Sequence, residues 1–486
     1  MNSRLPRGTG PGQLPRSPFG LLDELSCYYD TQAEPNNVHL EARVPGPVDY
    51  QALRQAVAGA LAAAPRARGR MVAGRSFRCR YTWEFPPVPD IDPLSRATWS
   101  DEQELATLRT RFLATAPPLS ASPPLRLLLA SGPGASVVLL NAHHAAMDGM
   151  SSLELLRDIA VRYRAVTGEP VRAGPAVPPP RHQAPAAPPP VAPPPVAPPP
   201  AGPPPRVPGR GPVAALLRYP VARVAPERER RARRDGCGLR LLLAPSVPKP
   251  SGATVNDVLV AALIATISRW NAAHRRRRAA IRITVPVNVR EPGLRGVAGN
   301  HSRIAIVTAA PRTAAGDLSA LLAAVTRQTR ALRQARPERV SAGSLGLAPG
   351  WCPVALKRLA VRFALRAIGG IVCDTAMLTN LGNVTDPPWS GSAGPVRMAL
   401  SGPARMPRGV SVGAVTADGQ LQLAFRYRYA LFDEAAATRF VAAYAATLGE
   451  LTKAAGLRTS SSQPLSDRTG RRSAPQASGL LPRGGE

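Results

Sequence analysis

The feature that most constrains the fold of this chain is a proline-rich segment, Ala173 to Pro212, near the middle of its 486 residues. It contains the run PPPVAPPPVAPPP. Proline fixes φ and lacks an amide hydrogen, so this segment forms neither a helix nor a central strand. We predict an extended polyproline II connector, and a plain linker is favoured over a ligand for an SH3-type domain. The foldable sequence is therefore divided into two parts.

Both parts combine strand and helix patterns, which predicts two α/β layers of similar make-up joined by the connector. The ends of the chain are rich in polar residues, glycine, proline or arginine, as is typical of disorder. The predicted divisions are a disordered N-terminus 1–18, an N-terminal half 19–172, a proline-rich and then arginine-rich connector 173–236, a C-terminal half 237–456 and a disordered tail 457–486.

Hydrophobic periodicity predicts the individual elements. The expected strands are residues 38–44, 77–83, 124–130, 136–141, 239–243, 281–288, 303–308, 377–380, 411–416 and 421–427. The expected helices are residues 50–64, 101–115, 258–271, 314–334, 353–369 and 433–451, with one more that begins near Ser151. Asp418-Gly419 between the last two strands predicts a hairpin turn.

The chain has a formal net charge of +31, from 62 basic and 31 acidic residues. Only Lys249, Lys357 and Lys453 are lysine, so arginine carries almost all of the excess. Enrichment in arginine, alanine, proline and glycine together indicates a compositional bias of the coding sequence. Since no RNP, zinc-finger or helix-turn-helix pattern is present, we do not expect a nucleic-acid partner. The charge favours acidic partners instead, such as phosphate-bearing cofactors, a carrier protein or anionic lipid headgroups.

Cysteine usage and hydropathy indicate the compartment. The five cysteines have no C-x-x-C spacing, and an odd number without a framework predicts free thiols in a reducing environment. The first 18 residues lack the apolar region of a signal peptide. The longest clean apolar run, Val258 to Ile267, is too short to span a bilayer. We therefore expect a cytoplasmic protein, with peripheral membrane contact left open. We also expect a monomer.

Two adjacent histidines stand where an expected strand gives way to an expected helix, in the stretch His143-His144-Ala-Ala-Met-Asp148-Gly149. Ser151 and the glutamate three residues later have the spacing of a capping box, which predicts that the helix begins there. Loops at the ends of rigid elements commonly carry catalytic and binding residues. This turn is therefore the first candidate site.

The residues of this turn allow several interpretations. A neutral imidazole is a suitable general base near neutral pH, whereas a histidine at a strand end can also be a plain polar residue. Asp148 suits either a turn or a pair with an arginine, and Gly149 permits a tight backbone. A metal site is disfavoured, because adjacent histidines on extended backbone point apart and no third ligand has zinc-site spacing.

Three later segments, taken in order with HHxxxDG, resemble one known group of enzymes. They are Thr254-Val-Asn-Asp257, Pro286-Val-Asn288-Val-Arg290 followed by Gly299-Asn300, and Thr379-Asn380-Leu-Gly382. Together they resemble the chloramphenicol acetyltransferase-like superfamily over about residues 20–455. That superfamily includes condensation domains of nonribosomal peptide synthetases, polyketide-associated acyltransferases and bacterial wax ester synthase/diacylglycerol acyltransferases. The DFGWG motif is absent and no clear PLW segment is present, so the subgroup stays open.

The resemblance implies an α/β fold of two chloramphenicol acetyltransferase-like mixed-sheet domains, which form a pseudo-dimer with a tunnel between them. An acyl thioester, on coenzyme A or on a carrier protein's phosphopantetheine arm, would enter as co-substrate, with no tightly bound cofactor. A hydroxyl or amine acceptor would enter from the other side. His144 matches the general base, with His143 beside it, and Asp148 matches the structural acid before Gly149.

The resemblance also implies residues that contact the substrate. In the C-terminal half these are Asn288, Arg290, Asn300, Thr379 and Asn380. Arg290 is the expected partner of Asp148. Thr379 or Asn380 is expected to line the tunnel or to contact the oxyanion.

The expected function is acyl transfer from a thioester to a hydroxyl or amine. A lipid O-acyltransferase is favoured by Thr254–Asp257, and the basic amphipathic helix expected at 353–369 suits peripheral contact with an anionic membrane. A free-standing condensation-type enzyme that takes carrier-bound acyl groups is the close rival. A non-catalytic binding or scaffold protein of the same fold is the alternative class.

Overall fold

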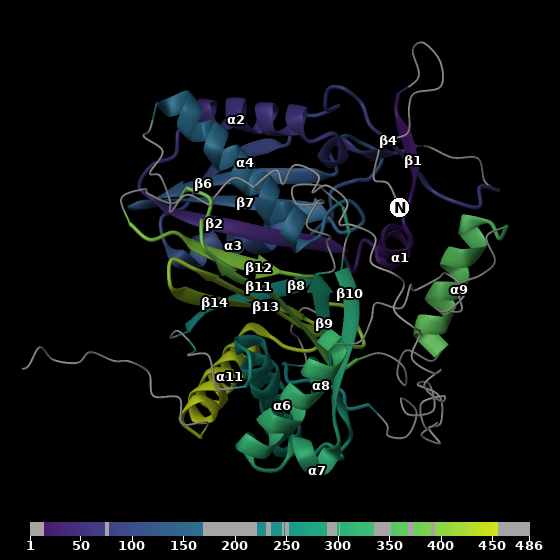
Figure 1. Ribbon diagram of the computed structural model, residues 1–486, viewed down its shortest axis with the longest axis vertical. Helices are drawn as coiled ribbons and strands as arrows, with labels where there is room; N and C mark the ends of the chain where they lie inside the picture. The colour runs from purple at the N-terminus through teal and green to yellow at the C-terminus, as the bar shows by residue number, and fades with distance from the viewer. Residues whose placement is uncertain are drawn as a thin grey trace, which may run out of the picture.

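The computed structural model describes residues 14–72, 77–168, 221–229, 235–244, 247, 252–288, 299–300, 302–334, 351–367, 374–389 and 394–454. The proline-rich segment and the tail 457–486 lie outside these ranges. Figure 1 shows the elements as stacked layers, with helices above and below two sheets.

The upper sheet has five strands, and it carries the candidate site at the end of one of them. In spatial order they are β12 (Arg397–Ser401), β2 (Asn37–Pro45), β7 (Ala135–His143), β6 (Leu125–Gly132) and β5 (Leu94–Thr98). Helices α2 (Tyr50–Ala63) and α4 (Gly149–Thr167) cover its outer face, and α3 (Glu102–Leu113) lies on the other. The predicted helices at 50–64 and 101–115 and the hairpin β6–β7 are confirmed. Strand β5 was not predicted.

The lower sheet has six strands of mixed direction. In spatial order they are β10 (Ser302–Ala309), β9 (Ile281–Asn288), β11 (Ala376–Val384), β13 (Val410–Ala417), β14 (Gln420–Arg428) and β8 (Cys237–Ala244). Strand β11 runs parallel to both neighbours, and the other pairs are antiparallel. The outer face is covered by α6 (Val255–Ala273), α7 (Pro311–Ala314), α8 (Leu318–Gln334) and α11 (Glu434–Ala454). The predicted helix 314–334 is thus two helices, α7 and α8.

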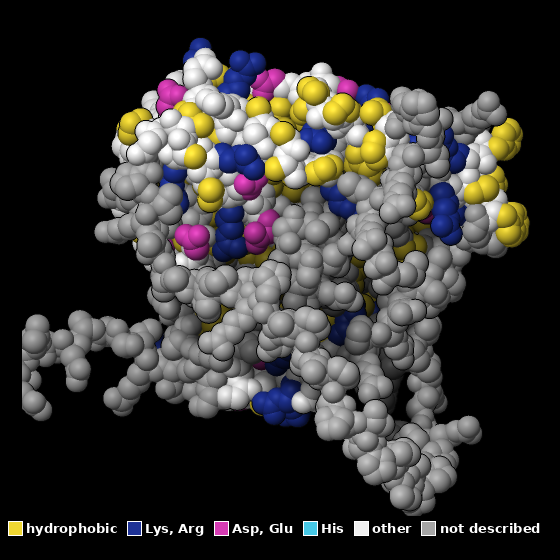
Figure 2. Space-filling view, turned by 45° about the horizontal axis from the view of Figure 1, so that its top comes forward, with side chains coloured by type: hydrophobic (Ala, Val, Ile, Leu, Met, Phe, Trp, Pro, Cys, Tyr) yellow, Lys and Arg dark blue, Asp and Glu magenta, His cyan; other side chains and the backbone are white. Residues whose placement is uncertain are grey.

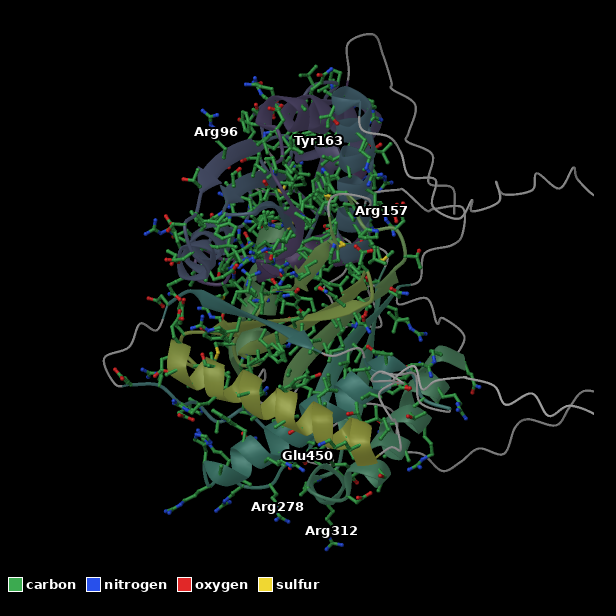
Figure 3. The ribbon with its side chains drawn as sticks, turned by 90° about the vertical axis from the view of Figure 1, so that its left-hand side faces the viewer. Arg96, Arg157, Tyr163, Arg278, Arg312 and Glu450 are labelled. Atoms are coloured by element: carbon green, nitrogen blue, oxygen red, sulfur yellow. The ribbon has the colours of Figure 1, made fainter. Side chains whose placement is uncertain are left out.

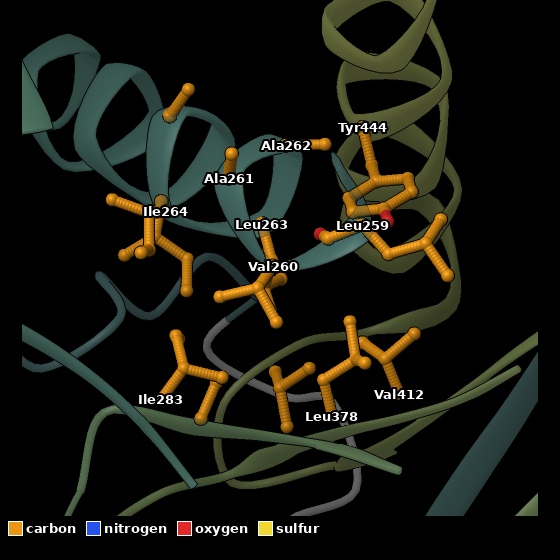
Figure 4. Packing of buried hydrophobic residues seen from close by; sticks show 14 of the residues in the cluster. Leu259, Val260, Ala261, Ala262, Leu263, Ile264, Ile283, Leu378, Val412 and Tyr444 are labelled. Carbon is orange, nitrogen blue, oxygen red and sulfur yellow. Dashed lines mark hydrogen bonds between the residues drawn. The ribbon is translucent and has the colours of Figure 1, made fainter. Parts of the chain in front are cut away.

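Helix α6 is the centre of the lower core. Every residue from Asp257 to Ile267 is buried, so this helix is packed on all sides rather than along one stripe. Figure 4 shows Leu259 and Leu263 between Tyr444 of α11 and the strands. The helix begins at Val255, three residues before the predicted start, because Thr254 and Asp257 form a reciprocal capping box.

A third, small sheet stands at one edge of the molecule. It consists of β1 (Arg16–Pro18), β4 (Thr82–Glu84) and β3 (Arg70–Met71), next to α1 (Leu21–Tyr29), a short 3-10 helix (Pro65–Arg68) and α9 (Val354–Ala367). Two predictions are corrected here. The strand expected at 77–83 is a strand only at its end, and the expected disordered N-terminus contains β1.

One strand of the C-terminal half lies in the sheet of the N-terminal half, which the sequence did not indicate. Strand β12 comes from the C-terminal half but pairs antiparallel with β2 of the N-terminal half. Residues 221–229, predicted to belong to the connector, place Val221, Val224 and Ala225 among the buried residues, so the lower layer begins before the predicted boundary at 237. Figure 3, seen from the side, shows Tyr163 of α4 and Glu450 of α11 in the two outer helical layers. None of the described helices is long and apolar enough to cross a bilayer.

Candidate active site

His143 is the last residue of β7, and its side chain is buried in the turn. Its Nδ1 accepts a hydrogen bond from the Ala145 amide at 3.0 Å, so the proton of the neutral ring belongs on Nε2. Nε2 lies 3.6 Å from the carboxylate of Asp30. Burial raises the pKa of Asp30, but hydrogen bonds from His143 and the Asn36 amide outweigh it, and the net pKa is lowered. Through these contacts, the His143 side chain stabilises the conformation of the loop.

His144, the next residue, has a different environment. Its backbone amide donates to Asn36 O at 2.9 Å, and its side chain is half-buried. The Nδ1 atom is buried and has no hydrogen-bond partner within the described ranges. Burial lowers the pKa of His144 below the ordinary value for histidine. Asp148 and Asn300 offset part of this effect, and a histidine that is neutral near pH 7 can act as a general base.

Asp148 and Gly149 build the turn into α4. Asp148 is the N-cap, and its Oδ1 accepts from the Ser151 amide at 2.8 Å. The helix therefore begins at Gly149, and the predicted start at a Ser151 capping box is wrong. A Cβ on Gly149 would lie 3.3 Å from side-chain carbons of Leu381 and Leu400. The glycine lets strands β11 and β12 approach the turn closely.

The C-terminal half supplies the other wall of the loop. The Asn300 amide group donates to His144 O at 2.7 Å, to Ala145 O at 3.2 Å and to Asp23 Oδ1 at 3.0 Å. Ser151 Oγ donates to Gly299 O and accepts from Gly299 N, at 2.9 and 3.0 Å. Asn300, predicted to contact substrate, therefore holds the backbone that carries His144.

Asp23 and Ser151 are site residues that sequence reasoning missed. Asp23 lies on α1, where burial raises its pKa even though the bond from Asn300 lowers it. No motif contains Asp23, and the spacing of Ser151 indicated a helix cap rather than a contact to Gly299. Their partners lie more than a hundred residues away in sequence, and local patterns carry no signal for such contacts.

The remaining predicted residues lie on or beyond strands of the lower sheet. Thr379 and Asn380 are half-buried on β11, and Asn380 Oδ1 accepts from the Gly382 amide at 2.8 Å. Gly382 has φ +79° at an irregularity of the β11–β13 pairing. This bulge precedes the strand's end and carries the neighbouring Leu381 toward Gly149. Asn288 ends β9, but its side chain and all of Arg290 lie outside the described residues.

This fold is shared with condensation domains. The structure is similar to the first condensation domain of the CDA synthetase, with a TM-score of 0.59 and 16% identity over 90% of this chain and 96% of that one. For the starter condensation domain of rhizomide synthetase, the TM-score is 0.56 and the identity is 13%, with 88% of this chain and 92% of that one covered. For an epimerization domain of tyrocidine synthetase B, the TM-score is 0.54 and the identity is 13%, with 92% of this chain and 99% of that one covered. The mixed α/β fold of two domains that was expected from the motifs is thus confirmed, and it is the fold of these condensation domains.

Sequence relatives narrow the family. The chain belongs to the family of the uncharacterized Mycobacterium tuberculosis proteins MT2362 and Rv2305, with 30% identity over 460 residues, 88% of this chain and 97% of theirs. It is also 35% identical over 150 residues to CymA of Salinispora arenicola, described as a nonribosomal peptide synthetase, which is 30% of this chain and 2% of CymA. No protein-family model matches the chain.

Proposed function

We propose that the chain is a condensation-type acyltransferase in which His144 acts as the general base. The observation that carries this proposal is the environment of His144. Its ring has an unpaired, buried Nδ1 and a lowered pKa, and its loop is held by Asn300 from the other half of the molecule.

The proposed reaction is one acyl transfer. The acceptor's hydroxyl or amine attacks the thioester carbonyl carbon while His144 takes the acceptor's proton. The new C–O or C–N bond forms, the C–S bond breaks, and the imidazolium returns the proton to the departing thiolate. No metal or redox group enters this balance. Asp148 keeps the turn in shape by capping α4, and a carboxylate is favourable at a helix N-terminus.

The remaining assignments follow from the resemblance. Arg290 would pair with Asp148, and Asn288, Thr379 and Asn380 would contact the substrate or line the tunnel. The donor would be an acyl-CoA or an acyl-carrier thioester rather than a resident cofactor. A thioester donor is supported by the similar starter condensation domain of rhizomide synthetase, a mutant of which forms a complex with C8-CoA and Leu-SNAC.

The test uses the purified full chain with a panel of acyl-CoAs and acyl-carrier proteins, plus cell extract as the source of acceptors. Acylated products are identified by mass spectrometry. We expect product with the wild type and a loss of about 10²–10⁴-fold in turnover with His144→Ala. The matched control is His274→Ala at the end of α6, which should leave turnover unchanged because His274 contacts Glu227 and Trp270.

The same experiment separates the alternatives. Full turnover by His144→Ala would remove the base role. Turnover with acyl-CoA alone would favour a lipid O-acyltransferase, and turnover with carrier-bound donors alone would favour a free-standing condensation enzyme. If a ligand binds but no thioester is ever consumed, the non-catalytic scaffold is the correct function.

A further inference from the structure

Helix α9 lies at the edge of the molecule, beside α1 and the loop before β4 (Figure 1). Its inner side includes the buried residues Val354 and Lys357. The Val354 amide donates to Arg78 O at 2.8 Å, and Lys357 Nζ donates to Cys79 O at 2.8 Å. Cys79 Sγ in turn donates to Trp351 O at 2.9 Å. The helix is thus docked through backbone groups and a buried lysine.

The outer side of α9 and its loop is apolar. The large side chains Trp351, Leu356, Leu359 and Phe363 are 76%, 56%, 64% and 70% exposed, and Phe77 of the docking loop is 83% exposed. A helix on the surface of a soluble domain normally turns its apolar stripe inward and its lysines outward. Here Leu356, Leu359 and Phe363 face outward while Lys357 is buried, and exposed apolar groups of this size mark an interaction surface.

The charge of this surface restricts its partner. The sequence of α9, VALKRLAVRFALRA, has four basic residues and no acidic one. Arg358 on the helix and Arg80 on the loop are exposed. Figure 2 shows hydrophobic side chains next to Lys and Arg at the right-hand edge, where α9 lies in Figure 1. A second copy of the chain would bring the same positive charge, with +31 on each chain, and so is disfavoured.

We propose that these residues form a docking face for an anionic lipid bilayer. The docking face is defined by Phe77, Arg80, Trp351, Leu356, Arg358, Leu359 and Phe363. Aromatic rings suit the headgroup level of a bilayer, leucines suit the acyl boundary, and arginines pair with lipid phosphates.

The docking face is close to the candidate site. Helix α1 lies between them, in contact with α9, and its Asp23 bonds to Asn300, which bonds to His144 O. Docking would therefore bring the His144 loop near the bilayer surface. The inference stands on exposure and charge alone, and it does not depend on the proposed acyl transfer.

Tryptophan fluorescence tests the proposal on the unmodified chain. Of the five tryptophans, Trp83, Trp99, Trp270 and Trp389 are at most 8% exposed, so Trp351 reports on the docking face. Vesicles of phosphatidylglycerol with brominated acyl chains should quench and blue-shift its emission. Phosphatidylcholine vesicles should bind at least tenfold more weakly. Absence of quenching with the anionic vesicles would overturn the proposal.

Variants separate the apolar and the charged contributions in a vesicle co-sedimentation assay. Trp351→Ser with Phe363→Ser should weaken partition at least tenfold. The matched control, Val88→Ser with Val161→Ser, removes side chains that are 70% and 56% exposed elsewhere and should change little. Because all four side chains are exposed, thermal melting should be the same for both pairs.

The double variant Arg80→Gln, Arg358→Gln should bind anionic vesicles more weakly, by about fivefold in the partition coefficient for each arginine removed. The control, Arg276→Gln with Arg277→Gln, removes the same charge from the exposed arginine run after α6. An equal loss in both pairs would mean diffuse adsorption of a basic protein and would refute a specific face.

Two further outcomes also refute it. One is a change in sedimenting mass of the Trp351/Phe363 variant without vesicles, which would show self-association. The other is that the Trp351/Phe363 variant loses binding to an acidic acyl-carrier protein while its partition onto vesicles is unchanged.

Discussion

At the scale of single residues, His143 and His144 are neighbours with different roles. His143 ends β7, whereas His144 lies in the turn that follows. The His143 ring is turned inward, where it accepts from Ala145 and faces Asp30. The His144 ring has an unpaired Nδ1 instead. The partners on each side therefore distinguish the two rings, and they favour His144 as the proposed base.

The pH dependence of activity follows from the burial of His144. Desolvation disfavours the imidazolium, so the ring stays neutral at pH values below 6.5, the ordinary pKa of histidine. The acidic limb of kcat/KM should therefore lie below pH 6.5. Because the unfolded chain binds this proton more readily, the same group should also destabilise the fold as pH falls below that value. A pH–rate profile limited by a group above pH 6.5 would contradict the assignment.

Asn300 should act as a positioning residue. Asn300→Asp places a carboxylate against two carbonyl oxygens and the Asp23 carboxylate, and should lower kcat at least about tenfold because the His144 loop shifts. KM for the thioester and the pKa limiting the rate should change less. The control is Asn383→Asp, which alters an exposed amide on β11. A pure rise in KM would instead support direct substrate contact.

At the scale of elements, β2 carries apolar residues toward α2 and α4 and polar ones toward α3. His39 Nε2 lies 3.1 Å from Glu41 Oε2, and Arg109 Nε of α3 donates to the same oxygen at 2.9 Å. His39 Nδ1 lies 3.2 Å from Ser401 Oγ of β12. All four residues are buried. This network joins α3, β2 and the strand from the other half.

Glu41→Gln should destabilise the protein strongly. Burial raises the pKa of Glu41, but Arg109 and His39 outweigh it and bring the pKa from 4.5 to about 2. Removing this charge leaves Arg109 uncompensated and should cost about 3 kcal/mol at pH 7. A carboxyl with a lowered pKa stabilises the fold fully above pH 4.5, and this contribution is lost as the pH falls toward 2. The difference in free energy of unfolding between wild type and variant should therefore narrow as the pH falls.

Urea unfolding of both proteins between pH 7 and pH 3 measures this gap. The control is Glu102→Gln, an exposed carboxylate paired with Arg43, which should cost less than about 1 kcal/mol. Equal effects of the two variants would show that the buried network contributes no more than a surface ion pair.

At the scale of the whole molecule, the two halves are held together by close backbone approach and by buried polar contacts. Arg426 of β14 is buried and donates to Asn37 O and Leu113 O of the N-terminal half, at 3.3 and 3.2 Å. Gly413 of β13 faces β12, where an added Cβ would lie 1.8 Å from Leu400 O. The sheets meet where only a glycine fits.

Gly413→Ala should therefore be among the most damaging small substitutions. The clash is with backbone, so the strands must move apart, at a cost of about 3 kcal/mol or more. The control is Gly449→Ala in α11, where an added Cβ meets nothing within 4 Å and should stabilise the helix by about 0.5–1 kcal/mol. Chemical denaturation measures both. A similar small effect at the two positions would mean that the halves are not packed this closely.

The sequence by itself determined what depends on local periodicity and turn chemistry. Helices α2, α3 and α11, the β6–β7 hairpin and the histidine turn at a strand–helix junction were predicted from patterns within about twenty residues. The hairpin turn at Asp418-Gly419 was predicted as well, and both residues have positive φ as such a turn requires.

Only the tertiary structure decided which distant segments meet. The pairing of β12 with β2 and the bonds from Asn300 to Asp23 and His144 O have no signal in local sequence. The amphipathic pattern of α9 was readable, but not which of its residues are exposed. An amphipathic pattern specifies that a helix has two faces, and packing alone decides which one is buried. The sequence likewise placed His144 on a turn, but its burial and its brace come from residues on the other half of the chain.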